Sequence, residues 1–299
     1  MNKPIREMFD ELPRVYEFIN HIVSLGLDIS WRKRAASLAA AKGGAIASRA
    51  TTKGGAMASL AAAKGGAAWL DVSTGTGEMA AYLRELAGPG TTVVATDFCM
   101  PMLLEARRKK EARQEKEAWY KKEAWPKDEA SSADKVTTKT VGRQAKGCDY
   151  QRQSSARGIL FAIADTGCLP FKPNSVDLVT ISLATRNIAT SREDLVSCLG
   201  EFNRILKPGG WFVNLETSQP DSPTVKRLFH KYVDVLLRPV GAAISGSKSS
   251  YSYLSSTIRG FYDAKDLSRI IKEAGFENIS VTKLFLGVAA IHEGEKRRR

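Results

Sequence analysis

The chain has 299 residues, of which 45 are Lys or Arg and 32 are Asp or Glu, so its formal net charge is +13. Its content of 43% apolar and 26% charged residues is typical of a globular protein with a buried core. No run of 18 apolar residues occurs, and the charged N-terminal stretch lacks the apolar segment of a secretory signal, so we expect neither a membrane span nor a leader. Four scattered cysteines without a C-x-x-C pair favour a reducing cytoplasm over a disulfide scaffold or a zinc site.

The positive charge is concentrated in two segments. Residues 31–66 hold seven basic and no acidic residues and include an 11-residue repeat of Ala, Lys and paired Gly, whereas residues 107–157 carry a net charge of +7. We interpret these stretches as insertions, at about 35–66 and 107–157, within a single domain that spans 1–299. Paired glycines disfavour a helix, so we expect the first insertion to be flexible or weakly helical. The second is expected to begin as a charged helix that Pro126 ends, and to be partly disordered beyond it.

Outside the insertions the chain alternates between predicted strands and helices. Short apolar runs typical of buried parallel strands occur at 67–73, 91–97, 159–165, 176–182 and 211–217. Helices are predicted at 78–87, from about 100 onward, at 193–206 and at 263–275. The KPGG stretch at 207–210 is predicted to be a C-cap and turn, and 279–293 a final hairpin. Successive β-α units predict an α/β fold with a doubly wound, mostly parallel sheet, to which the hairpin adds an antiparallel strand at the end.

Polar residues and glycines follow the predicted strands at their carboxyl ends, where ligands bind in sheets of this type. The candidates for a bound cofactor are Asp71, Gly75, Thr76, Gly77, Asp97, Asp165, Thr166 and Ser182. Asp97 ends the second strand, 20 residues after Gly77, and its carboxylate suits hydrogen bonds to two ribose hydroxyls. Asp165 and Thr166 end the third strand, where a polar side chain can read an adenine edge.

This pattern alone leaves two cofactors open. The stretch from Gly75 to Ala80 also satisfies the G-x-G-x-x-A form of a dinucleotide fingerprint. Asp71, four residues before Gly75, favours S-adenosylmethionine, because a carboxylate so close would repel a pyrophosphate but can orient the loop or meet the cationic methionine end.

Further motifs resemble one known family. They are REMFDELPRVYEFINHIVSLGLDISWRKRAA near the N-terminus, the loop LDVSTGTGE, the central stretch ADTGCLPFKPNSVDLVTISLATRNI, and LKPGG and YSYL toward the C-terminus. Together they resemble the ubiquinone/menaquinone biosynthesis C-methyltransferase family of class I S-adenosylmethionine-dependent methyltransferases. The resemblance covers nearly all of the chain outside the two insertions. It implies a Rossmann-like fold with a seven-stranded sheet and N-terminal helices.

The resemblance also implies an activity and roles for residues. The activity is S-adenosylmethionine-dependent C-methylation of a prenylated quinol, of the demethylmenaquinol or polyprenyl-benzoquinol type. Cofactor contacts are implied at Thr76, Asp97, Asp165, Thr166 and Ser182, and a catalytic role for the pair Arg186-Asn187, with Arg186 beside the reacting ring. For the substrate pocket we expect Tyr16, His21, Tyr251 and Tyr253, roofed by the amphipathic segment 222–262. No metal site is indicated.

Departures from the family pattern leave the ring type open. Glu17, Glu78 and Ala184-Thr185 stand where the family usually shows other residues, so a benzoquinol, a naphthoquinol or another prenylated aromatic such as a phenazine remains possible. Arg186 has an alternative interpretation as a structural residue paired with a carboxylate such as Glu216. A non-catalytic scaffold is a further alternative, opposed by the intact glycine loop.

The expected partners follow from the substrate class. A prenylated lipid substrate favours a cytoplasmic protein in peripheral contact with an anionic membrane, and a homodimer remains open. The basic segments raise a nucleic-acid methyltransferase as a second function, but 180–186 reads TISLATR instead of the N/D-P-P-Y-type tetrad that such enzymes often carry, so nucleic acid is not an expected partner.

Overall fold

The computed structural model describes residues 20–22, 24–52, 66–123, 158–245 and 257–298. Its seven strands are β1 (Ala68–Val72), β2 (Thr92–Asp97), β3 (Ile159–Ile163), β4 (Val176–Ser182), β5 (Leu206–Thr217), β6 (Phe276–Leu284) and β7 (Ala289–Lys296). Its α-helices are α3 (Leu27–Thr52), α5 (Glu78–Leu86), α6 (Met100–Glu123), α8 (Arg192–Ile205), α9 (Pro223–Ser245) and α11 (Ala264–Glu273). Two short 3₁₀ turns, η2 (Thr185–Asn187) and η3 (Phe285–Gly287), follow β4 and β6.

The strands form one sheet in the order β3-β2-β1-β4-β5-β7-β6. Strands β1 to β5 pair in parallel, and β7 runs antiparallel to both of its neighbours, β5 and β6. The chain reverses its winding direction between β1 and β4, so the carboxyl ends of these two strands form the topological switch point. The predicted seven-stranded, mostly parallel sheet is therefore confirmed. The antiparallel strand lies inside the sheet, between β5 and β6, and not at its edge.

The predicted strands and helices outside the two insertions are confirmed, but the KPGG stretch is not a turn. Leu206–Thr217 is one strand, so residues 207–210 continue β5 instead of forming a turn after a helix. Gly209 has a φ of +77°, and a Cβ on Gly210 would lie 2.8 Å from the carbonyl oxygen of Lys207. The glycines therefore serve an irregular entry into β5, where its register against β4 shifts, and α8 ends directly before it.

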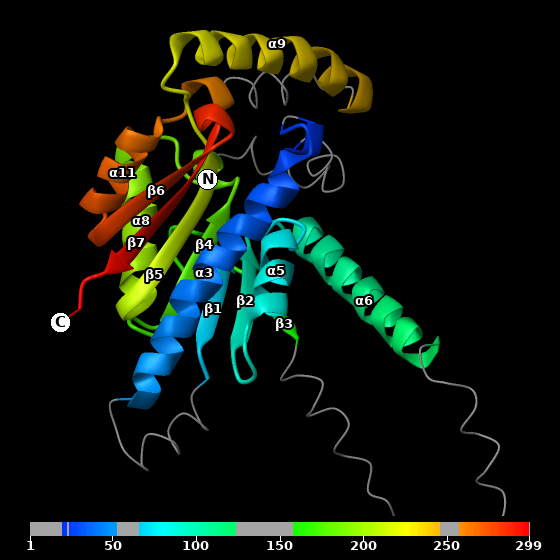
Figure 1. Ribbon diagram of the computed structural model, residues 1–299, viewed down its shortest axis with the longest axis vertical. Helices are drawn as coiled ribbons and strands as arrows, with labels where there is room; N and C mark the ends of the chain where they lie inside the picture. Colours follow the sequence, from blue (N-terminus) through cyan, green and yellow to red (C-terminus); the bar gives the residue numbers. More distant parts are fainter. Residues whose placement is uncertain (1–19, 23, 53–65, 124–157, 246–256, 299) are drawn as a thin grey trace, which may run out of the picture.

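Helices cover both faces of the sheet (Figure 1). On one face the buried residues of α3 and α5 pack against strand residues such as Trp69, Leu178 and Val213. On the other face α8 and α11 pack against Val72, Val179 and neighbouring strand residues. Helix α9 lies beyond the carboxyl edge, at the top of Figure 1, and contributes Phe229 and Val233 to the cluster of α3. Helix α9 therefore covers the edge of the sheet at which the parallel strands end.

Helix α3 extends into the segment predicted to be the first insertion. Ala35, Ala36 and Ala39 are fully buried against the sheet, and Gly43 lies so close to Trp69 that a Cβ would be 2.7 Å from its indole ring. Small side chains allow this close packing of a helix on a sheet. The predicted start of the insertion, at about residue 35, therefore lies within a helix that packs on the core, and residues 53–65 lie outside the described residues.

Helix α6 likewise carries the chain into the predicted second insertion. Met102, Leu103 and Ala106 are buried, and the Nζ atom of Lys110 donates to the carbonyl oxygen of Ile159 in β3 at 3.2 Å. The expected charged helix is present as far as Glu123. Residues 124–157, which hold the rest of that insertion, lie outside the described residues.

Two adjacent glycines of α3 test how far the core extends along this helix. Replacing Gly44 by Ala should stabilise the fold by about 0.5–1 kcal/mol, because a helix interior disfavours glycine and no atom lies within 4 Å of the new Cβ. Replacing Gly43 by Ala should lower the free energy of unfolding by about 1–3 kcal/mol, because the new methyl group overlaps Trp69. Urea unfolding measures both values. Stabilisation of equal size by the two substitutions would contradict the packing of α3 on β1.

Candidate functional site

The carboxyl ends of β1, β2 and β4 bring the predicted cofactor residues together. Strand β1 lies between β2 and β4, and its Asp71 is in register with Ala95 of β2 and Thr180 of β4. Asp97 ends β2 and Ser182 ends β4. These polar side chains therefore meet at the switch point because parallel strands end at the same edge.

Asp71 is a fully buried carboxylate within the sheet. The hydroxyl of Thr180 donates to its Oδ1 at 2.7 Å, and the hydroxyl of Thr74 in the following loop donates to its Oδ2 at 2.6 Å. Burial raises the pKa of Asp71 to about 6, against the effect of these two hydrogen bonds and of Arg32, which lower it. Asp71 thus ties β1, β4 and the cofactor loop to one another.

The loop between β1 and α5 requires two glycines. Gly75 and Gly77 have φ angles of +57° and +81°, in the left-handed region that favours glycine. A Cβ on Gly77 would lie 2.9 Å from the side chain of Ala106 in α6, whereas a Cβ on Gly75 would meet nothing within 4 Å. Gly77 therefore permits close packing against α6, and the loop backbone at Gly75 remains accessible to a ligand.

Asp97 holds this loop from the neighbouring strand. Its Oδ2 accepts the amide of Gly75 at 2.9 Å, and its Oδ1 accepts the amide of Cys99 at 3.0 Å. Burial raises the pKa of Asp97, and the backbone hydrogen bonds oppose that increase. Each carboxylate oxygen has a second lone pair, so Asp97 retains acceptor capacity for the two hydroxyls of a ribose.

A small cavity of about 40 Å³ lies against the loop. Its lining comes from β1 and the loop that follows it, from the end of β4, and from the N-terminal region. These lining residues include Asp71, Ser73, Thr74, Gly75, Thr76, Ser182, Asn20 and Arg32. Ser182 Oγ is buried and makes no hydrogen bond to any residue that the structure describes. A buried hydroxyl without a protein partner is suited to a polar ligand. The Ser182 hydroxyl at the switch point is therefore available to a polar group of a bound cofactor.

Asp165 and Thr166 are not among the residues that line this cavity. The amide of Ala164 donates to the carbonyl of Asp97 at 3.0 Å, which places the two residues directly after the end of β3, next to β2. Asp165 is exposed and accepts the amide of Gly167 at 2.9 Å. Thr166 is buried and its side chain is hydrogen-bonded to Cys198. Their predicted role at an adenine edge remains a prediction.

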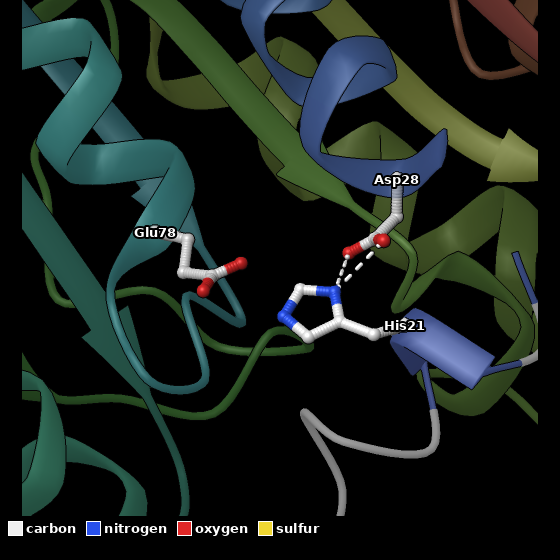
Figure 2. A group of neighbouring side chains, drawn as sticks. All are labelled: His21, Asp28 and Glu78. Atoms are coloured by element: carbon white, nitrogen blue, oxygen red, sulfur yellow. Dashed lines mark hydrogen bonds and ion pairs between the residues drawn. The ribbon is translucent and has the colours of Figure 1, made fainter. Parts of the chain in front are cut away.

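His21 lies above the loop and pairs with the start of α3. Its Nδ1 is 2.8 Å from both carboxylate oxygens of Asp28, and Figure 2 shows this pair facing Glu78 of α5. The hydroxyl of Ser24 also donates to Asp28 at 2.7 Å. Burial acts to raise the pKa of Asp28, but Arg32 and the hydrogen bonds from His21 and Ser24 outweigh it, so that pKa is lowered. Asp28 is therefore an anion with three polar neighbours.

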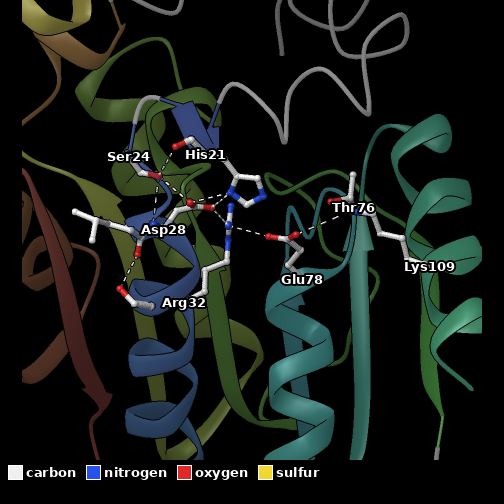
Figure 3. Close-up of polar contacts among 9 residues, drawn as sticks. His21, Ser24, Asp28, Arg32, Thr76, Glu78 and Lys109 are labelled. Carbon is white, nitrogen blue, oxygen red and sulfur yellow. Dashed lines mark hydrogen bonds and ion pairs between the residues drawn. The ribbon is translucent and has the colours of Figure 1, made fainter. Parts of the chain in front are cut away.

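Arg32 continues this network to the glycine loop (Figure 3). Its guanidinium forms ion pairs with Asp28 and, at 2.8 Å, with Glu78. From the other side, Nζ of Lys109 in α6 donates to the hydroxyl of Thr76 at 3.3 Å and lies 3.9 Å from Glu78. The network therefore joins α3, α5 and α6 around the loop.

The same carboxylates raise the question of a bound cation. The ligand atoms of His21, Asp28 and Glu78 lie within 4.8 Å of one another. The guanidinium of Arg32 contacts both carboxylates and supplies the positive charge that they require. The geometry therefore gives no reason to place a metal ion there.

Arg186 and Asn187 lie in η2, directly after β4, and both are buried. Nη1 of Arg186 is 2.6 Å from Oε1 of Glu216 in β5, and the two side chains are 2% and 0% exposed. Glu216 also accepts the backbone amides of Arg186 and Thr217. The ion pair considered as the structural alternative for Arg186 is thus present, and it fixes the guanidinium at the carboxyl edge. Of the predicted pocket residues, Tyr16, Tyr251 and Tyr253 lie outside the described residues.

Sequence reasoning missed several contributors to this site. Thr74 and Thr180 hold Asp71, and Arg32 and Lys109 act through Glu78 and Thr76. The sequence carries a signal for Thr74 and Thr180, because both adjoin motifs that were recognised. It carries none for Lys109, which lies in a stretch interpreted as an insertion.

Comparison with known proteins identifies the family. The profile of the ubiE/COQ5 methyltransferase family matches residues 1–141 and 140–296. The chain belongs to this family. The resemblance seen in its motifs is therefore confirmed, and the chain is an enzyme that transfers a methyl group from S-adenosylmethionine.

Individual relatives are similar over nearly the whole chain. The chain is 31% identical over 289 residues to a demethylmenaquinone methyltransferase of Thermus thermophilus, covering 97% of this chain and 100% of the relative. It is 30% identical over 297 residues to a demethylmenaquinone methyltransferase of Lactiplantibacillus plantarum, covering 99% and 97%. It is 28% identical over 290 residues to a ubiquinone/menaquinone biosynthesis C-methyltransferase of Acidiphilium cryptum, covering 97% and 89%.

A solved structure supports the fold. An S-adenosylmethionine-dependent methyltransferase from Thermotoga maritima, described as a possible histamine N-methyltransferase, superposes with a TM-score of 0.52 at 14% identity over 98% of this chain and 100% of the other. This likeness shows the fold alone, and it confirms the predicted Rossmann-like methyltransferase architecture.

The contribution of Asp97 to cofactor binding can be measured directly. Asp97→Ala should weaken S-adenosylmethionine binding by about 2–3 kcal/mol, because charge-assisted hydrogen bonds to the ribose and the restraint on Gly75 are lost. Asp177→Ala is a matched control, since Asp177 is also a buried carboxylate that accepts a backbone amide, from Ala68, but at the opposite edge of the sheet. Titration calorimetry on the folded variants measures both affinities, and equal losses would exclude a specific role for Asp97.

The pKa of Asp71 predicts a pH dependence of stability. The pKa rises from 3.8 to about 6 on folding, so between these values the unfolded chain releases a proton that the folded chain keeps. Stability is therefore lost as the pH rises through this range, by up to about 3 kcal/mol. Asp71→Asn removes the contribution, so its free energy of unfolding relative to wild type should increase from pH 4 to pH 7. The other carboxylates contribute equally to wild type and variant, so their effects cancel in the difference between the two free energies of unfolding. A difference that does not change with pH would show that the pKa of Asp71 is not raised on folding.

Proposed function

We propose that this chain transfers a methyl group from S-adenosylmethionine to a ring carbon of a prenylated quinol. The observation that carries the proposal is the cavity at the switch point, where Asp71, Gly75 and Ser182 of the cofactor edge meet Asn20 and Arg32 of the N-terminal region. Relatives that match nearly the full chain are named demethylmenaquinone methyltransferase and ubiquinone/menaquinone biosynthesis C-methyltransferase. These names support a quinol acceptor of either ring type.

The cofactor supplies an activated methyl group on a sulfonium. The protein must therefore bind the donor, align the acceptor carbon with the transferring bond, and favour the phenolate form of the quinol, since an aromatic carbon is a weak nucleophile until its neighbouring hydroxyl loses a proton. Asp97 and the loop at Gly75 hold the donor side. The acceptor side requires a positive or hydrogen-bond-donating group close to where the phenolate forms.

Arg186 is our candidate for that group. A guanidinium keeps its proton at any physiological pH, so Arg186 does not act as a literal base. Its role is to stabilise the phenolate or to orient the water that accepts the proton. The ion pair with Glu216 supports this role by fixing the guanidinium after the end of β4, four residues beyond Ser182 in the cofactor cavity. Asn187, the next residue of η2, is proposed to assist it.

Several finer assignments belong to this proposal. The ring and the tail length depend on the acceptor pocket, for which His21 is the described candidate. We also propose that the protein is cytoplasmic and contacts an anionic membrane peripherally. A homodimer is a further part of the proposal. Within the described residues, no helix has both the length and the apolar character needed to cross a membrane.

Identification of the methylated product tests the proposal. The protein is incubated with methyl-labelled S-adenosylmethionine and short-tailed demethylmenaquinol, a prenylated benzoquinol without a ring methyl group or a prenylated phenazine, and the products are analysed by mass spectrometry and NMR. The proposal predicts a new carbon-bound methyl group on a quinol ring. Methylation at oxygen, or of the phenazine alone, would contradict it.

Substitution of Arg186 tests its catalytic role against a purely structural one. Arg186→Lys keeps the charge opposite Glu216 but loses the planar fork, so turnover should fall by about 10²-fold while cofactor affinity stays near that of wild type. Higher pH should partly restore turnover, because hydroxide then deprotonates the quinol. Arg192→Lys is the control, since Arg192 forms an exposed ion pair with Glu273 and its replacement should leave turnover unchanged. Unchanged turnover per folded molecule with a lower melting temperature would make Arg186 structural.

A further inference from the structure

Exposed apolar side chains gather around the carboxyl edge, where the acceptor must enter. They come from three segments: Leu25 and Ile29 at the start of α3, Leu228 and Val235 on α9, and Phe285 and Leu286 in η3. We call these six residues the apolar rim. Leu25, Leu228 and Leu286 are 64%, 64% and 74% exposed. Figure 1 shows the start of α3, α9 and the turn between β6 and β7 all at the top of the molecule.

Contacts between the three segments show that the rim is one surface. The hydroxyl of Tyr232 in α9 donates to the carbonyl of Ile22 at 2.7 Å, which joins α9 to the segment before α3. On the other side, the amide of Ser218 donates to the carbonyl of Val288 at 2.7 Å, and Lys283 forms an ion pair with Asp221. The residues that lead into α9 therefore lie against the turn that carries Phe285 and Leu286.

Helix α9 has one face that packs on the domain and one face that is exposed. Phe229 and Val233 are buried against the domain. Leu228, Lys231 and Val235 are exposed and lie at i, i+3 and i+7, so they share one outward stripe. The stripe presents two large apolar side chains together with a lysine, whose long stem lets its ammonium group reach lipid headgroups beside them.

The charge around the stripe is positive. Lys226, Arg227 and Lys231 are exposed on α9. The acidic residues of the same segment are engaged elsewhere, because Asp221 pairs with Lys283 and Asp234 pairs with Arg259. The three cations of α9 are therefore not neutralised by these carboxylates, and they complement the anionic headgroups of a membrane.

We infer that the apolar rim and the cations of α9 form a membrane-docking surface that seats the carboxyl edge on an anionic bilayer. This inference rests on the proposed function, since a prenylated quinol resides in the bilayer and its ring has to reach the edge where Asp71 and Asp97 lie. Docking in this orientation lets the tail remain in lipid while the ring enters. A second copy of the chain is a poorer occupant, because a two-fold interface through this surface would bring Lys226, Arg227 and Lys231 against the same residues of the partner.

Vesicle co-sedimentation of the full chain tests the surface. Binding to vesicles of phosphatidylcholine with about 30 mol% phosphatidylglycerol should exceed binding to phosphatidylcholine alone and fall with salt. Leu228→Glu should lower the partition coefficient about tenfold or more, since a charge replaces a side chain that enters the interface. Lys231→Gln should lower binding to the anionic vesicles about fivefold. Leu86→Glu is the matched control, because Leu86 is a 48% exposed leucine at the end of α5, a helix that starts at the carboxyl edge and runs away from it, and this variant should bind as wild type does.

Two outcomes would overturn the inference. One is vesicle binding that Leu228→Glu leaves unchanged or that Leu86→Glu lowers equally. The other is a wild-type dimer in sedimentation that Leu228→Glu dissociates while vesicles bind neither form. Turnover separates this inference from the proposed function. With a short-tailed soluble quinol, Leu228→Glu should match wild type, and with a long-tailed quinol in vesicles it should be slower. Failure of wild type on both quinols with vesicle binding intact would contradict the proposed function and leave the docking surface in place.

Discussion

The site depends on one carboxylate buried where the sheet reverses its winding. Asp71 lies in β1 between two parallel neighbours, and hydroxyl groups from Thr180 of β4 and Thr74 of the loop satisfy its oxygens. Burying a carboxylate is unfavourable unless hydrogen bonds compensate for lost hydration, and the raised pKa of Asp71 shows that compensation is incomplete. The unfavourable free energy of burying Asp71 therefore arises at the switch point, where the positive charge of a bound cofactor can compensate for it.

The remaining elements restrain the loop that follows Asp71. Asp97 holds the amide of Gly75 from β2, and Arg32 and Lys109 reach the loop and the start of α5 from α3 and α6. Each contact comes from a different element, so the cofactor side of the site forms only when the helices have packed on the sheet. The end of β4 is restrained in the same way, since η2 and β5 contribute the two members of the Arg186–Glu216 pair.

The sequence predicted the parts of this structure that have a local signal. The strands at β1, β2 and β4 were identifiable because their apolar runs end in Asp71, Asp97 and Ser182. The position of β7 between β5 and β6 was not, because strand order depends on tertiary packing and leaves no local pattern. The Gly-Ala repeat was interpreted as an insertion because paired glycines disfavour helices, yet Gly43 is small for a reason that only the fold shows, namely the indole of Trp69. The pairing of Arg186 with Glu216, 30 residues apart, was foreseen as an alternative but could not be decided before the strands were placed.

A crystal structure of the chain with S-adenosylhomocysteine and a short-tailed quinol would test the central claim most directly. We expect the ribose hydroxyls on the carboxylate of Asp97, the amino-acid end of the ligand beside Asp71 and Ser182, and the quinol ring between the sulfur atom of the ligand and the guanidinium of Arg186. A ligand bound elsewhere, such as in the pocket of about 150 Å³ that Ala81, Arg84 and Lys110 line between α5 and α6, or a quinol ring remote from Arg186, would contradict this arrangement.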